Sequence, residues 1–180
     1  SQASHVPFRL GMNALDYLGV NVYSLTATTV EARLHHLPRS SSIVLEKPVG
    51  FESILIVRVL DDGVLAMAAA PDPRRRRYGF WNLDGAYLGP VGEPEGTTDV
   101  LFNNRGWGVG VNGGRLQFFD GSSWTERPIA DMGGCSLSHI NDFNDRGDFV
   151  GEVRDDDGPR RDFWALLATA SPSNRLTASG

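Results

Sequence analysis

The sequence FNDRGDFVG, residues 143–151, decides the fold because three other segments align with it around a central glycine without gaps. Their glycines follow one another at intervals of 44, 43 and 41 residues, so a period near 43 accounts for almost all of the 180 residues. Self-similarity at such a period is typical of repeat architectures, in which each unit packs on its neighbours. The aligned segments are LDYLGVNVY from residue 15, VLDDGVLAM from residue 59 and FNNRGWGVG from residue 102.

Each copy has the composition of a β-hairpin. An apolar residue stands four positions before the glycine, and Asp, Asn or, in one copy, Leu stands three before it. Asn or Asp can open a tight turn, glycine can take the left-handed conformation that ends it, and β-prone residues leave on both sides. Gly19, Gly63, Gly106 and Gly147 are therefore predicted to close four equivalent turns between two strands.

Each unit continues with a second apolar or aromatic run that predicts a third strand. These runs are VEARLHHL from residue 30, RYGFWNL from residue 77, GRLQFFD from residue 114 and RDFWALL from residue 161. A fourth, outer strand fits in the polar stretch that follows, for example at 42–46 and at 127–131. VEARLHHL and VLAMAAA also suit a helix by propensity, but the repeat equates both with strands.

Four strands in about 43 residues is the size of one blade of a β-propeller. We therefore expect an all-β, propeller-like domain over residues 1–170, with repeats at about 1–46, 47–91, 92–132 and 133–170 and a polar tail at 171–180. An open array would leave sheet edges unpaired. Four blades closing in a monomer is favoured, and a ring shared by a homodimer is the main alternative.

The fourth unit also resembles a known family. GGCSLSHINDFNDRGDFVGEV, from residue 133, and RRDFWALL, from residue 160, are similar to the HAF repeat, and the other units resemble it more weakly. The resemblance implies a propeller-like extracellular repeat without an assigned activity. The histidine of the His-Ala-Phe element is absent from every copy, so no catalytic residue is implied.

Composition excludes several classes of partner. Seventeen basic against twenty-two acidic residues leave a net charge of −5, whereas phosphate-backbone binding needs a basic face, so nucleic acid is not expected. The longest apolar run, residues 64–70, is far shorter than the roughly 20 residues of a membrane helix, so no membrane partner is expected. The single cysteine, Cys135, lacks the paired spacing of a disulfide or zinc site. No metal or cofactor is predicted.

The location of the protein stays open at this stage. The given chain begins without a positively charged, apolar leader, which predicts a soluble protein that is cytoplasmic, or secreted if the chain is a trimmed mature form.

Candidate site residues are polar side chains on the strands that lead into the repeat turns. A central channel lined by these strands would let Arg58, Asp99 and Asp142 hold a polar ligand. Arg75 and Arg76, in a long loop with four arginines, are further ligand-binding candidates because guanidinium groups grip carboxylates and phosphates. The remaining ligand-binding candidates are Asn13, Ser138, His139 and Asn141. The same charged residues are also open to a structural interpretation, as mutually paired or solvated groups.

Two functions follow from these candidates. The first is a non-catalytic binding module whose face recognises a small polar molecule, a glycan or a protein. The second is a small metal-independent enzyme, a lyase, cyclase or hydrolase, with its active site in the channel. Its candidate catalytic residues are His139, Asp142 and Asp99, and Arg58 would stabilise an anion.

Overall fold

The computed structural model describes residues 5–24, 30–72, 75–127, 129–130, 135–155, 164–169 and 176–177, and side chains within 12–23, 30–72, 75–127 and 136–154. The chain divides into two compact units, unit 1 at Ser1–Gly92 and unit 2 at Glu93–Gly180. The predicted all-β class is confirmed: in the described ranges the regular elements are strands, apart from the short 3₁₀ helix η1 (Leu37–Arg39). No described helix is long and apolar enough to span a membrane.

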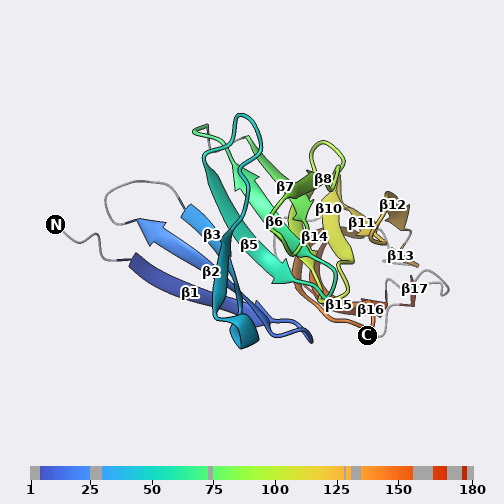
Figure 1. Cartoon of the computed structure of the whole chain (residues 1–180). Helices are drawn as coiled ribbons and strands as arrows, with labels where there is room; N and C mark the ends of the chain where they lie inside the picture. Colours follow the sequence, from blue (N-terminus) through green and yellow to red (C-terminus); the bar gives the residue numbers. More distant parts are fainter. Residues whose placement is uncertain are drawn as a thin grey trace. The chain divides into compact units, whose positions relative to one another are not determined.

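Unit 1 contains two antiparallel four-stranded sheets, each a meander in chain order (Figure 1). VEARLHH and VLAMAA form strands, as the repeat predicted against their helical propensity. The first sheet consists of β1 (His5–Met12), β2 (Tyr17–Ser24), β3 (Val30–His36) and β4 (Ser41–Val44). The second consists of β5 (Ser53–Val59), β6 (Val64–Ala69), β7 (Arg76–Trp81) and β8 (Tyr87–Pro90).

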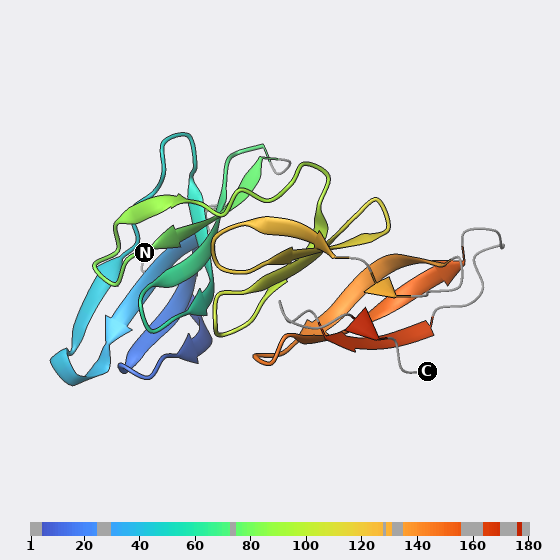
Figure 2. The same ribbon diagram turned by 90° about the vertical axis from the view of Figure 1, so that its right-hand side faces the viewer.

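Unit 2 contains a four-stranded and a three-stranded antiparallel sheet (Figure 2). The first has the order β12-β11-β10-β9 and the second β14-β15-β16. The first consists of β9 (Thr98–Phe102), β10 (Gly108–Asn112), β11 (Arg115–Phe119) and β12 (Trp124–Arg127). The second consists of β14 (Cys135–Phe143), β15 (Asp148–Asp155) and β16 (Trp164–Thr169).

One strand prediction in unit 2 is wrong. The outer strand expected at 127–131 lies earlier, as β12, because Trp124 to Arg127 pair with β11. The following strand, β13 (Ile129–Ala130), instead pairs in parallel with β17 (Leu176–Thr177) in the predicted polar tail. The other residues of 171–180 lie outside the described ranges.

Both units have an apolar core beneath their sheets. In unit 1, Leu34, Ile56 and Trp81 are completely buried, and the Trp81 indole N–H donates to the main-chain oxygen of Glu46 at 2.8 Å. In unit 2, Val109 and Phe118 are equally buried beside residues of β14 and β15. Each core therefore joins the two antiparallel sheets of its own unit.

The turns follow a five-residue pattern that begins with asparagine. The Asn Oδ1 accepts hydrogen bonds from the main-chain N–H groups two and four residues later, and the fourth residue has a positive φ. The asparagine side chain thereby stabilises the turn through hydrogen bonds to its main chain, as in an Asx-turn. It occurs at 13–17, 82–86, 103–107 and 144–148.

Gly106 and Gly147 occupy the left-handed position of this turn, as predicted, with φ values of 75° and 88°. The predictions for Gly19 and Gly63 are wrong. Gly19 lies inside β2, and Asp16, with a φ of 60°, takes the turn position instead. Gly63 ends a shorter turn, closed by a hydrogen bond from Leu60 N to Gly63 O, and its φ is not positive.

In each of the four antiparallel sheets, the first strand contains a β-bulge where it pairs with the second strand. The irregularities lie between Arg9 and Met12 in β1, and between Ile56 and Arg58 in β5. In β9 the irregularity lies opposite Gly110, and β14 contains two such irregularities. An extra residue in one strand bends it and redirects the neighbouring side chains. These bulges determine where the polar candidate residues point.

Candidate functional site

Asp99 lies in the bulge of β9. Leu101 pairs with Val109 and Thr98 pairs with Val111, so Asp99 and Val100 face Gly110 alone. Asp99 has a φ of 52°, which is unusual for a residue other than glycine, although Asp tolerates it better than most. A Cβ at Gly110 would lie 2.5 Å from Thr97 Cγ2, so any larger residue opposite the bulge would force the Thr97 side chain to move.

Strand β14 has two bulges, whose extra residues are Ser138 and Asn141. Consequently its buried residues, Leu137, Ile140 and Phe143, are spaced by three instead of two. The residues between them point outward, so a polar pair fits between successive apolar residues without entering the core.

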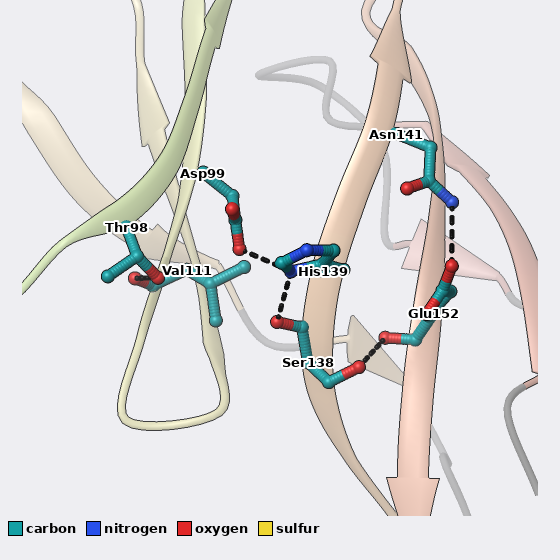
Figure 3. A network of polar contacts seen from close by, with 7 residues as sticks. All are labelled: Thr98, Asp99, Val111, Ser138, His139, Asn141 and Glu152. Carbon is teal, nitrogen blue, oxygen red and sulfur yellow. Dashed lines mark hydrogen bonds and ion pairs between the residues drawn. The ribbon is translucent and has the colours of Figure 1, made fainter.

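The two bulged strands bring Asp99 and His139 into contact, since β14 packs against β9 in unit 2. The His139 Nδ1 atom lies 2.7 Å from Asp99 Oδ2 and 3.1 Å from the main-chain oxygen of Ser138 (Figure 3). The His139 side chain is 58% exposed and the Asp99 side chain 26% exposed. The pair therefore links two sheets at an accessible surface.

The surroundings raise the pKa of His139 above its ordinary value of 6.5. The largest cause is the hydrogen bond to the Ser138 carbonyl oxygen, followed by the negative charge of Asp99; Glu152 adds a smaller effect, and desolvation opposes these. Groups that accept from the imidazole favour its protonated form. The protonated form of His139 is therefore favoured over that of an ordinary histidine.

Four further residues complete the polar surface around the pair. Glu152 is the cross-strand partner of His139, and its Oε1 accepts from Asn141 Nδ2 at 3.3 Å. Its main-chain oxygen accepts from Ser138 Oγ at 3.2 Å. Asp142 is exposed, and its Oδ1 accepts from the N–H of Phe143 at 2.8 Å. We define the His139 surface as Asp99, Ser138, His139, Asn141 and Glu152, which Figure 3 draws, together with the exposed Asp142 of the same strand.

The structure brings five predicted residues together on the His139 surface: Asp99, Ser138, His139, Asn141 and Asp142. Arg58 belongs to unit 1, so its predicted grouping with Asp99 and Asp142 stays a prediction. It follows the bulge residue Val57, is half-buried, and donates from Nη1 to the Val57 oxygen at 2.8 Å. Arg75 and Arg76 of unit 1 are both exposed. Arg75 directly precedes β7, and Arg76 is the first residue of that strand.

Asn13 is held in a structural role. Its side chain is buried, its Oδ1 accepts from Leu15 N and Tyr17 N, and its Nδ2 donates to the Leu60 oxygen at 2.7 Å. The main-chain N–H of the neighbouring Ala14 donates to Asp61 Oδ1, so two hydrogen bonds join this turn to residues 60–61. These hydrogen bonds use most of the capacity of the amide.

Sequence reasoning missed Glu152 and Gly151. A Cβ at Gly151 would lie 2.5 Å from the His139 main-chain oxygen, so only glycine fits across from this part of β14. In the third and fourth units a second glycine, Gly110 or Gly151, follows the turn glycine by four residues. A glycine inside a strand often marks a bulge or a closely approaching backbone, so this spacing could have indicated the bulges. Glu152 could be paired with His139 only once the bulge at Asn141, which lies between His139 and the turn, was placed.

Within the described residues, no group of three or more His, Cys, Asp or Glu side chains is placed to hold a metal ion. No family model matches the chain, and no curated protein or solved structure matches it either.

Proposed function

We propose that the protein is a non-catalytic binding module that recognises a polar ligand, a small polar molecule, a glycan or a protein, through the His139 surface of unit 2. The observation that supports this most is the contact between His139 Nδ1 and Asp99 Oδ2 at 2.7 Å. It orients an exposed imidazole by means of a carboxylate from another sheet. Orientation before binding reduces the entropy that a ligand contact has to overcome.

The backbone at Asp99 supports the same proposal. A non-glycine residue with a φ of 52° costs about 1 kcal/mol or more and persists only where the surrounding structure holds it. Such conformations gather at binding and catalytic sites. Here the unusual conformation places the carboxylate against His139, which gives the strain a role in positioning the imidazole.

The finer architecture belongs to the same proposal. Each antiparallel sheet lies inside one of the four predicted repeats, and each begins with a bulged strand followed by a tight turn. This recurrence supports propeller-like blades and the relation to HAF repeats. Native mass spectrometry tests the assembly: a monomer is expected for a ring closed by one chain, and a homodimer for a ring shared by two.

Ligand binding is tested by thermal shift with the full chain and a panel of neutral monosaccharides, disaccharides and free amino acids. A ligand that binds only the folded state raises the melting temperature. The shift should disappear in His139→Gln and Asp99→Asn. It should persist in His35→Gln, which changes a half-buried histidine of unit 1. A shift that survives in His139→Gln, or no shift with any probe, would contradict the proposed surface.

The same pair favours the enzyme as the second candidate. A carboxylate that binds one imidazole nitrogen leaves the other free to act as a general base. His139→Gln would then abolish turnover of a bound compound while its affinity is retained, whereas a binding module would lose affinity. The exposure of the imidazole favours the binding module, because general bases work best where water is excluded.

A further inference from the structure

The two ring nitrogens of His139 have different surroundings. Nδ1 faces Asp99 Oδ2 at 2.7 Å and the Ser138 carbonyl oxygen at 3.1 Å, and both of these are hydrogen-bond acceptors (Figure 3). If Nδ1 carried a lone pair, it would point at two oxygen lone pairs. A proton on Nδ1 replaces this repulsion with a three-centre hydrogen bond that the two oxygens share.

Among the described residues, the charged groups that act on the ring are both acidic. Asp99 approaches from β9, and Glu152 lies across the ladder on β15. In the part of the chain that the structure describes, Nε2 has no hydrogen-bond partner, and the side chain is largely exposed. The proton that leaves on titration is therefore the one on the exposed side of the ring.

We propose that His139 is held as a single tautomer with its proton on Nδ1, and that its exposed Nε2 is a pH-dependent acceptor for an uncharged, hydroxyl-bearing ligand. The ligand part of this inference rests on the proposed function. The tautomer part rests on the geometry around Nδ1 alone.

The chemistry of the surrounding surface favours hydroxyl donors. Asp99, Asp142 and Glu152 supply carboxylate oxygens, and Asn141 uses its Nδ2 on Glu152, which leaves its Oδ1. A surface with this excess of acceptors complements a ligand rich in O–H donors, while its negative charge disfavours anions. Protonation of Nε2 removes one acceptor, so affinity should fall as the pH drops through the pKa of His139.

The tautomer is tested with the ¹⁵N-labelled full chain by long-range ¹H–¹⁵N NMR at a series of pH values, with His139→Gln identifying the signals. Nδ1 should stay protonated throughout, only Nε2 should titrate, and the midpoint should fall in Asp99→Asn. Asp62→Asn, at an exposed aspartate of a unit 1 turn, serves as the matched control and should not move the midpoint. A neutral ring with its proton on Nε2, or the same midpoint in Asp99→Asn, would overturn the inference.

The ligand part is tested in the same spectra with N-acetylglucosamine, a neutral hydroxyl-rich probe, and methylammonium, a cation. The sugar should shift Nε2 above the midpoint and progressively less below it. A response to methylammonium in place of the sugar would overturn the hydroxyl assignment. A proton fixed on Nδ1 with no response to either probe would contradict the proposed binding surface and leave the tautomer standing, so the two failures are distinguishable.

Discussion

Asn103 Nδ2 donates to the main-chain oxygen of Asn144 at 3.0 Å, and Asn13 makes the corresponding contact with Leu60 at 2.7 Å. In both cases the amide reaches from the turn of one sheet to the turn of the next sheet in the same unit. A neighbouring aspartate, Asp145 or Asp61, accepts from a main-chain N–H in the first turn. One asparagine thus shapes its own turn and fastens it to the following one.

Replacement of Asn103 should therefore destabilise unit 2. Asn103→Ala removes the acceptor for Arg105 N and Trp107 N together with the contact to Asn144. The side chain is buried, so the expected loss in the free energy of unfolding is about 1–3 kcal/mol, measured by urea denaturation. Asn104→Ala, at the exposed neighbouring residue, should cost less. An equal loss in both variants would contradict the role given to Asn103.

Adding or removing a side chain at the left-handed turn position should change stability in opposite directions, as Gly147 in the fourth repeat and Asp16 in the first repeat can show. Gly147→Ala places a Cβ at a φ of 88° and should cost about 1 kcal/mol. Asp16→Gly removes a side chain from the equivalent position, with a φ of 60°, and should be neutral or slightly stabilising. Thermal unfolding of both variants measures the effect. Marked destabilisation by Asp16→Gly would show that its carboxylate has another role.

The His139 pair should add a pH-dependent contribution to stability. Because the folded-state pKa of His139 is raised, this contribution is fully present below the unfolded value of about 6.5 and is lost as the pH rises through the higher folded value. Relative to His139→Gln, the wild-type protein should therefore lose stability across that window. Urea denaturation at several pH values measures it, and a wild-type advantage that grows with pH would contradict the sign.

The glycine opposite His139 should be needed for the geometry of the site. In Gly151→Ala the new Cβ would meet the His139 main-chain oxygen, so β14 has to shift, at an expected cost of about 1–3 kcal/mol. The shift should weaken the contact with Asp99 and return the pKa of His139 toward its ordinary value, as measured by NMR titration. Val150→Ala, at an exposed neighbour, is the control and should leave this pKa unchanged.

Much of the fold could be predicted from the repeat, because hairpin composition is local. Aligned copies identified β3 and β6 as strands although both suit a helix. The alignment failed at Gly19, because a gapless alignment tracks glycine and the first turn uses Asp16 instead. The pairing of β13 with β17 brings together segments far apart in the sequence, which no local pattern records.

The polar residues of the site were visible in the sequence, but their partners were not. Charged and polar side chains among apolar neighbours in β9 and β14 pointed to Asp99 and His139. Their contact depends on two bulges and on the packing of one sheet against another. A strand read with a period of two misplaces every side chain beyond a bulge, which is why Glu152 was missed.

The spacing of three between Leu137, Ile140 and Phe143 also means that β14 can change its length. Deleting Ser138 would remove one of the two bulges and leave Leu137 and Ile140 on the same face of the strand, whereas deleting Ile140 would take a residue out of the core. We expect the first deletion to be soluble and folded by circular dichroism and the second not. Gains and losses of single codons can thus accumulate at the bulges, which lets the copies of a repeat drift apart in length while the core residues stay in place.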